Sequence, residues 1–276
     1  MRQINKIIED IDISVTNLKY FENSLALRYQ EVSKYDKFSF VEEHGRIMLF
    51  SNLNMIRRAI YPYKTYTSKP KIKLEVGSVE DGNSILHLIA NRRTKRLYKN
   101  YKISTIELYK ILHYSYGITG EAKVHGENEI WHYRAVPSGG ALYPLELYVY
   151  INKASIKTGL YHYRPDSDSL EFIDENMVLE QLKPNIACGN INVEECSCII
   201  FITSLFQRSM IKYAERGYRF ILQEVGAVCQ NISLICESLK LGSCILGGYI
   251  DDNINNILKV ITPVETIQGV IVIGKN

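Results

Sequence analysis

The clearest pattern in the chain is a run of apolar residues three and four positions apart in its last quarter. This spacing places the side chains on one face of an α-helix, which then packs against the rest of the protein. The sequence therefore predicts a long core helix that Gly242 ends. Its apolar face comprises Tyr218, Ile221, Leu222, Val225, Val228, Ile232, Ile235 and Leu239.

Shorter apolar runs predict strands on both sides of this helix. Residues 145–151 alternate apolar and polar side chains, and residues 198–205 are almost continuously apolar, as in a central strand. Residues 159–163 and 170–173 flank the turn sequence R-P-D-S-D-S and predict a hairpin. Residues 270–273 predict a terminal strand.

Helix-start signals predict further helices. Asn83 or Ser84 can cap a short helix through Ile89. The sequence S-T-I-E at 104–107 is a capping box, in which the serine and the glutamate satisfy each other's backbone amides, and it opens a helix that Gly117 closes.

The chain of 276 residues divides into an N-terminal extension, residues 1–80, and a domain, residues 81–276. The extension mixes short apolar runs with turn residues and gives no clear elements. The domain has strands and helices, including one that Asp251 or Asp252 caps. We expect an α+β fold, in which a mixed sheet is flanked by helices around the long core helix.

Charge and composition exclude several classes of protein. With 33 Lys and Arg against 30 Asp and Glu, the chain lacks the basic character expected of a nucleic-acid-binding protein. It has no apolar run long enough for a membrane helix and no signal peptide, so we expect a cytoplasmic protein. Its cysteines are expected to be reduced core residues at positions 188, 196, 198, 229, 236 and 244.

Motifs for common chemistries are absent. No H-E-x-x-H occurs, and Cys196-x-Cys198 lacks a second pair, so no metal site is expected. Residues 269–276 nearly spell a phosphate-binding P-loop, but aliphatic residues fill the place of the loop and no helix follows. No G-x-G-x-x-G or G-x-S-x-G is present either.

Three segments look suited to an anionic, planar ligand. Residues 92–96, R-R-T-K-R, combine four cations and a hydroxyl, as a phosphate site requires, although alone they resemble a solvated helix end. Residues 137–141, P-S-G-G-A, remove side-chain bulk so that backbone amides can approach a flat ligand, although alone they resemble a tight turn. Residues 244–248, C-I-L-G-G, offer a second such surface.

Taken together, these segments resemble the nitroreductase superfamily of flavin mononucleotide (FMN) enzymes, and more narrowly its SagB-type branch of azoline dehydrogenases. The resemblance also rests on P-S-G-G-A-L-Y-P-L-E-L-Y at 137–148, G-L-Y-H-Y-R-P at 159–165 and K-Y-A-E-R-G-Y-R-F at 212–220. It covers about residues 81–276 and implies the nitroreductase-like fold and a homodimer.

The resemblance implies a role for each of these segments. One set of residues would hold the FMN phosphate and ribityl chain: Arg92, Arg93, Thr94 and Arg96, with Lys275 as an additional cation. A second set would lie along the isoalloxazine, often from the partner subunit: Pro137, Ser138, Gly139, Gly140 and Ala141. A third would offer backbone donors near N5: Leu246, Gly247 and Gly248.

Lys212 and Tyr213 match the Lys-Tyr pair implied to transfer protons in azoline dehydrogenases. The implied reaction converts a peptide thiazoline or oxazoline to the aromatic azole by removing a proton and a hydride, with Lys212 as the base. Without the resemblance, the two residues would simply begin the long helix. Ala227 occupies a position where relatives often carry a histidine, and this departure argues against a role for a helix histidine here.

The resemblance implies a precursor peptide as substrate and a cyclodehydratase or leader-peptide-binding protein as partner. Two other interpretations remain open. The first is an NAD(P)H-dependent flavin reductase of nitro compounds or quinones. The second is a scaffold subunit of a peptide-modifying complex that performs no catalysis.

Overall fold

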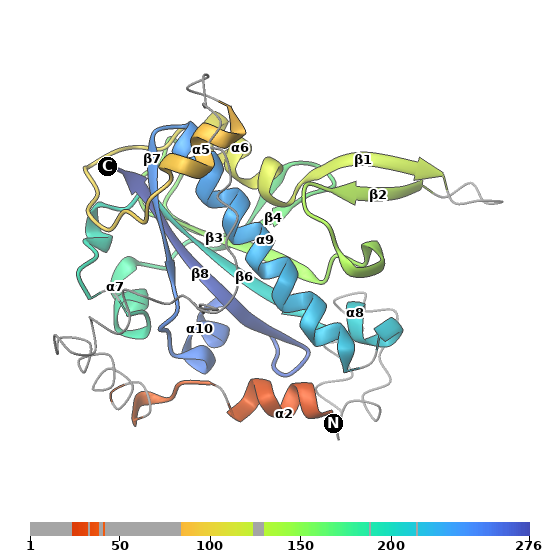
Figure 1. The fold of residues 1–276 in the computed structure, drawn as a ribbon. Coiled ribbons are helices and arrows are strands. Elements are labelled where there is room, and N and C mark those ends of the chain that lie inside the picture. The colour runs from red at the N-terminus through yellow and green to blue at the C-terminus, as the bar shows by residue number, and fades with distance from the viewer. Residues whose placement is uncertain are drawn as a thin grey trace, which may run out of the picture.

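The computed structural model describes residues 24–32, 34–38, 41, 84–123, 130–187, 189–213 and 215–276 (Figure 1). Its helices are α2 (Leu25–Val32), α5 (Ile85–Asn91), α6 (Thr105–Tyr116), α7 (Leu179–Leu182), α8 (Phe206–Tyr213), α9 (Arg216–Ser238) and α10 (Asp251–Leu258). Its strands are β1 (Ile118–Lys123), β2 (Ile130–Arg134), β3 (Leu145–Ile151), β4 (Gly159–Arg164), β5 (Ser169–Asp174), β6 (Cys198–Leu205), β7 (Leu241–Leu246) and β8 (Glu265–Lys275).

A six-stranded sheet in the order β5-β4-β3-β6-β8-β7 forms the centre of the molecule. Each neighbouring pair in it is antiparallel. The sheet was expected to be mixed, but its strands are all antiparallel. Among the described residues, parallel pairing is limited to two isolated bridges, Thr94 with Ser243 and Ile103 with Ala154. All eight residues of β6 are buried, as expected of a central strand.

Helices cover both faces of this sheet. The long helix α9 crosses one face, where Ile221, Val228 and Ile232 pack with inward residues of β3, β6 and β8. On the other face α7 and α10 contribute Leu182, Ile254 and others to a second core. The expected α+β class, with helices flanking a sheet around one long helix, is confirmed.

Several expectations need correction. The sequence predicted no element between Gly117 and Arg134, but β1 and β2 pair there as a separate hairpin. Helix α9 ends before Gly242, which lies inside β7 opposite Gly274. Neither aspartate caps α10, because Ile250 holds the N-cap position; the Asp251 carboxylate instead accepts the Tyr35 N–H at 3.2 Å.

The expectations for the cysteines and for the N-terminal extension can be compared with the structure only in part. Five cysteines are free and buried, as expected of core residues, whereas Cys188 lies outside the described residues. Only residues 24–32, 34–38 and 41 of the expected extension are described, and they include α2, which packs against the domain. No described helix is long and apolar enough to cross a membrane.

Candidate functional site

The segment 137–141 forms a tight turn that leads into β3. Gly140 has φ of +65°, in the left-handed region where a glycine is favoured, and Ala141 and Tyr143 follow with positive φ. The turn is closed by two hydrogen bonds at 3.0 Å, from the Ala141 N–H to the Ser138 carbonyl and from the Tyr143 N–H to Ser138 Oγ. Gly140 is nevertheless exposed.

Lys212 and Tyr213, the last residues of α8, lie directly against this turn. A Cβ atom placed on Gly140 would be 2.6 Å from Tyr213 Oη and 2.9 Å from Lys212 Nζ. The ring of Phe220, from α9, meets Tyr213 edge-on at 5.0 Å, and a Cβ on Gly139 would lie 2.9 Å from it. The two motifs, about 70 positions apart in sequence, are thus brought together. We call this group the lysine–tyrosine corner.

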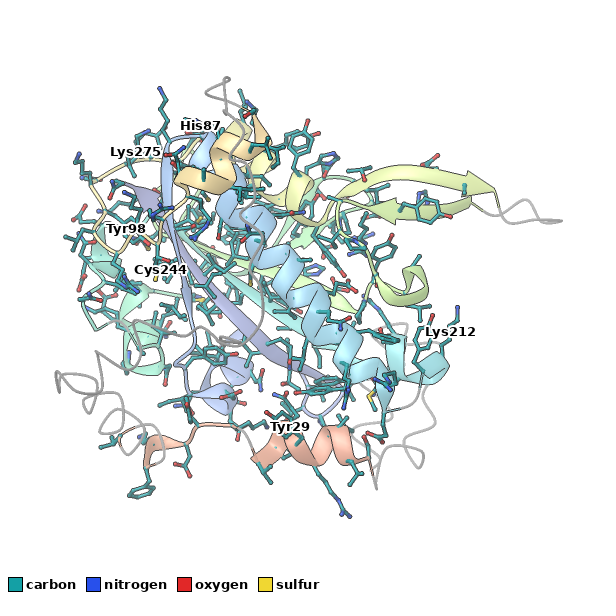
Figure 2. The ribbon with its side chains drawn as sticks, viewed as in Figure 1. Tyr29, His87, Tyr98, Lys212, Cys244 and Lys275 are labelled. Carbon is teal, nitrogen blue, oxygen red and sulfur yellow. The ribbon has the colours of Figure 1, made fainter. Side chains whose placement is uncertain are left out.

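The pair does not begin the long helix, because it ends a separate helix, α8, before α9 starts. Lys212 is exposed and Tyr213 is half-buried. Figure 2 shows Lys212 at the outer end of α8. The described part of the chain therefore leaves the Lys212 side chain in contact with water.

A chain of charges runs from α8 beneath this corner, and sequence reasoning missed it. Arg208, one helical turn before Lys212, pairs with Glu146 Oε1 at 2.5 Å and donates to the Tyr143 carbonyl at 3.2 Å. The other Glu146 oxygen contacts His162 Nε2 at 2.9 Å. Burial would raise the pKa of Glu146, but His162 and Arg208 hold it below its usual value. Arg208 lies within no recognised motif, and only the fold reveals its partners.

A second missed group supports the turn from the side of α6 and α9. Tyr116 Oη donates to Glu224 Oε1 at 2.9 Å and accepts the Leu145 N–H at 3.0 Å. The Arg134 guanidinium lies over the Tyr116 ring at 4.3 Å. Burial raises the pKa of Glu224 although hydrogen bonds from Ser138 and Tyr116 oppose the shift. The turn is therefore anchored at both ends by buried polar contacts.

The cation segment, residues 92–96, runs beside the edge strand β7. The Thr94 backbone bridges Ser243, and the Lys95 N–H donates to the Ser243 carbonyl at 3.0 Å. A Cβ on Gly242 would be 2.7 Å from Lys95 Cβ. Position 242 in β7 therefore needs a glycine so that the cation segment can approach the strand. This contact explains Gly242, which the sequence suggested as the end of the long helix.

The side chains of this segment carry charge without an internal counter-charge. Arg92 is half-buried, while Arg93, Thr94 and Arg96 are exposed. Within the part of the chain that the structure describes, none of the cations at 92, 93, 95 and 96 pairs with a carboxylate. Exposed, unneutralised arginines of this kind suit a phosphate.

The remaining predicted residues lie along the same edge of the sheet. Lys275, the last residue of β8, has its ammonium 5.3 Å from the Tyr101 ring, and its carbonyl accepts the Lys99 N–H at 2.7 Å. Leu246 is buried at the end of β7, where Gly247 is exposed and a Cβ on it would meet no atom within 4 Å. Together with residues 92–96 we call this group the cation corner.

The two corners lie far apart in one chain. Three strand pairings separate β3 from β7, or roughly 14 Å at the usual spacing between strands. The strand register places Ser243 of β7 level with Ile151 of β3. Ile151 lies six residues along β3 from Leu145, where the turn ends, so the two corners are also separated by roughly 20 Å along the strands. Figure 2 shows Lys275 and Lys212 on opposite sides of the molecule.

This fold and arrangement correspond to a known family. The chain belongs to the nitroreductase family, whose model matches residues 89–275. It is 32% identical over 174 residues to MJ1384 of Methanocaldococcus jannaschii, a nitroreductase by name, covering 63% of this chain and 83% of that protein.

A second relative is named for the processing of microcin B17. The chain is 30% identical over 124 residues to the microcin B17-processing protein McbC of Escherichia coli, covering 43% of this chain and 45% of McbC. The match therefore spans less than half of that relative. A chain of the E. coli microcin synthetase McbBCD complex, with truncated pro-MccB17 bound, has the same fold, at TM-score 0.56 and 20% identity over 90% of this chain and 97% of that one.

Proposed function

We propose that this protein is an FMN-dependent dehydrogenase that oxidises thiazolines or oxazolines of a precursor peptide to thiazoles or oxazoles. The observation that carries the proposal is the contact of Lys212 and Tyr213 with the Gly140 turn. Such a contact puts an amine and a phenol beside open backbone, where a flat substrate and a flat cofactor can meet. The similarity to a microcin-processing protein supports a peptide substrate.

The residues present fit FMN. The phosphate and ribityl chain would be held by Arg92, Arg93, Thr94 and Arg96, whose cations have no carboxylate partner among the described residues, with Lys275 nearby. Gly140, beside Tyr213 and Lys212, and Gly247, with no atom within 4 Å of a Cβ placed on it, are both exposed and could offer backbone to the flavin ring. When bound, FMN would supply the two-electron oxidation.

The chain's own residues would handle the proton. Lys212, as the neutral amine, would accept the proton from the alpha carbon of the azoline, and the hydride from the beta carbon would pass to bound FMN, so that the azoline ring becomes aromatic. Tyr213 Oη donates a hydrogen bond to the ring nitrogen. Its position is fixed by the edge contact with Phe220, which also lies against the turn.

The two corners of one chain are too far apart to enclose a single ligand, so we place the site between two copies of the chain. The cation corner of one copy then faces the lysine–tyrosine corner of the other, as a two-fold dimer requires. The same covering would exclude water from Lys212. A cyclodehydratase or leader-peptide-binding protein would present the cyclised precursor.

The mass of a thiazoline-containing peptide tests the proposal. Incubated in air with the protein and FMN, and without nicotinamide, the peptide should lose two hydrogens per ring, and a flavin-free control should lose none. Unchanged mass with flavin-loaded protein and an added presentation partner would overturn the proposal.

Family membership also favours a second candidate, an NAD(P)H-dependent reductase of nitro compounds or quinones. A reductase should be bleached within seconds by a nicotinamide donor and should then pass the electrons to a quinone. A dehydrogenase of azolines needs no such donor. A scaffold without catalysis would instead purify without flavin absorbance.

A further inference from the structure

Helix α2, from the N-terminal part of the chain, docks beside the lysine–tyrosine corner. Figure 1 shows it crossing the end of the molecule where α8 and α9 meet. Ser24 Oγ and the Ala26 N–H donate to the Glu215 carboxylate at 3.0 and 2.7 Å. Glu215 is the N-cap residue of α9 and lies two positions after Tyr213. Its negative charge also lies at the start of α2, where a helix dipole favours it.

A second contact of α2 is buried. Gln30 is 6% exposed, and its Oε1 accepts a hydrogen bond from Tyr218 Oη at 2.8 Å, while its Nε2 donates to Thr266 Oγ1 at 3.2 Å. Gln268 Nε2 also donates to Gln30 Oε1, at 3.2 Å. This one side chain therefore ties α2 to the first turn of α9 and to β8.

The first turn of α9 in turn lies against α8. A Cβ on Gly217 would be 3.0 Å from Met210 Cα and 3.0 Å from its backbone nitrogen, so the two backbones are in close contact. Met210 precedes Lys212 by two positions. A shift of this turn must therefore displace the end of α8 that carries the pair.

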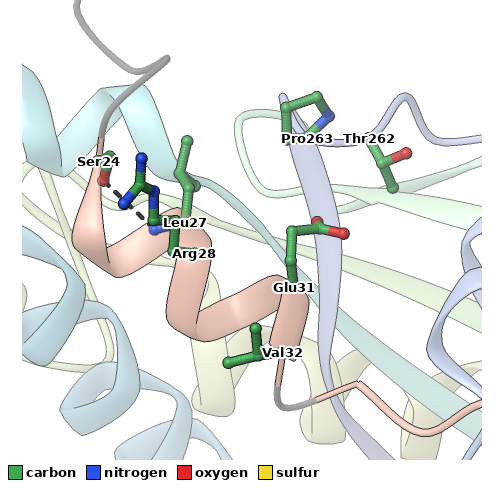
Figure 3. A pocket seen from close by; sticks show the side chains of 7 residues that line it. All are labelled: Ser24, Leu27, Arg28, Glu31, Val32, Thr262 and Pro263. Atoms are coloured by element: carbon green, nitrogen blue, oxygen red, sulfur yellow. Dashed lines mark hydrogen bonds between the residues drawn. The ribbon is translucent and has the colours of Figure 1, made fainter.

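The rest of α2 is loosely held. Leu25 and Val32 are 69% and 81% exposed. Leu27, Arg28 and Glu31 border a cavity of about 470 Å³ between α2 and the Thr262–Pro263 turn (Figure 3). The helix is thus attached through polar contacts at Glu215 and Gln30, together with a small apolar contact in which Ala26 and Leu27 pack with the core.

We propose that α2 is a positioning element for the reaction, acting through Glu215 and Gln30 to hold the α8–α9 junction that orients Lys212 and Tyr213. The role rests on the proposed function. Part of the N-terminal extension would thus have a role in the reaction, although neither Glu215 nor Gln30 needs to touch the substrate.

Hydrogen exchange of the full chain tests the contact without any substrate. In Glu215→Ala and Gln30→Ala, amides of residues 206–213 and 216–218 should exchange about fivefold faster, the factor expected for one lost hydrogen bond. Glu215→Gln keeps an acceptor oxygen and should stay near the wild type. Lys34→Ala is the matched control, because it breaks the pairs with Glu31 and Asp252 at the far end of the segment. Unchanged exchange in both alanine variants overturns the inference.

Kinetics then test the consequence. The two alanine variants should lower kcat for azoline oxidation about tenfold with KM and flavin content within about twofold of the wild type, since misplacement affects the reaction and not the binding. Glu215→Gln should restore most of kcat. Faster exchange with unaltered kcat contradicts the positioning role. A wild type that oxidises no azoline refutes the proposed function, while the exchange result still decides whether α2 holds the junction.

Discussion

The two corners of the sheet differ in how completely their side chains are satisfied within one chain. At the lysine–tyrosine corner, the turn around Gly140 is closed by hydrogen bonds, and Arg208 and Glu146 pair beneath it. At the cation corner, no arginine pairs with a carboxylate in the described parts of the chain, although Arg93 Nη1 donates to the Ala90 and Arg92 carbonyls at 2.9 and 2.8 Å. The first corner is therefore held by contacts within the chain, whereas the cations of the second have no carboxylate partner among the described residues.

This difference predicts that the two corners contribute differently to cofactor binding and to the reaction rate. Binding strength should come from the cation corner, where a phosphate would neutralise exposed charge. Reaction rate should come from the lysine–tyrosine corner, where geometry is fixed in advance. Substitutions in the two corners should therefore separate flavin affinity from turnover.

Loss of the amine should give the largest effect. Lys212→Ala should lower azoline oxidation by about a thousandfold, the typical contribution of a general base, while flavin content stays the same. Turnover and flavin absorbance of the same preparation measure both quantities. Full activity in this variant would remove Lys212 as the base.

Substitution in the cation corner should affect binding instead. Arg96→Ala should raise the Kd for FMN about tenfold to a hundredfold, the range for one charge-assisted hydrogen bond, and kcat at saturating FMN should stay near that of the wild type. Quenching of flavin fluorescence on titration gives the Kd. Lys110→Ala, on the exposed side of α6, is the matched control. Equal affinities would show that the arginine does not hold the phosphate.

A methyl group on the turn should disturb stability and turnover together. Gly140→Ala should lower the free energy of unfolding by about 1–2 kcal/mol, because its φ of +65° strains an L residue and its Cβ would collide with Tyr213 and Lys212. Gly226→Ala, inside α9 with open space around it, should be neutral or slightly stabilising. Urea unfolding compares the two, and similar losses would contradict the close contact.

The pH dependence of stability should show the smallest effect. Burial alone would lower the pKa of His162, but hydrogen bonds and charges from Glu146 and Glu171 raise it above 6.5. This contribution to stability is therefore fully present below pH 6.5 and is lost as the pH rises through the higher folded-state value. Urea midpoints between pH 6 and 9 should fall more steeply in the wild type than in His162→Gln. Parallel profiles would remove the network as a source of this dependence.

Local signals in the sequence predicted elements well where neighbouring residues determine them. The capping box at Ser104 and Glu107 is confirmed, with the Ser104 N–H donating to Glu107 Oε2 at 2.9 Å. The expected strands at 145–151 and 198–205 are also found with the same bounds. The β1–β2 hairpin was missed because I-T-G-E-A-K has no clear alternation of apolar and polar residues.

The arrangement of the candidate site could not be read from the sequence. The motifs identified each segment, but the approach of Gly140 to Lys212 depends on how α8 packs beside β3. The role of Gly242 was misjudged because its tight neighbour, Lys95, is almost 150 positions away. Arg208 and Gln30 were missed for the same reason, since their partners belong to other elements.

Mixing two inactive variants tests the central claim, that each site is built from the two corners of different copies. Chains of Lys212→Ala and Arg96→Ala would be dissociated and reassembled together, which gives mixed dimers with one intact site. The FMN concentration is kept too low to saturate the Arg96→Ala variant. We expect recovery of up to about a quarter of wild-type oxidation, because half of the dimers are mixed and half of their sites are intact. No recovery, with mixed dimers confirmed by native mass spectrometry, would contradict a site shared between two copies.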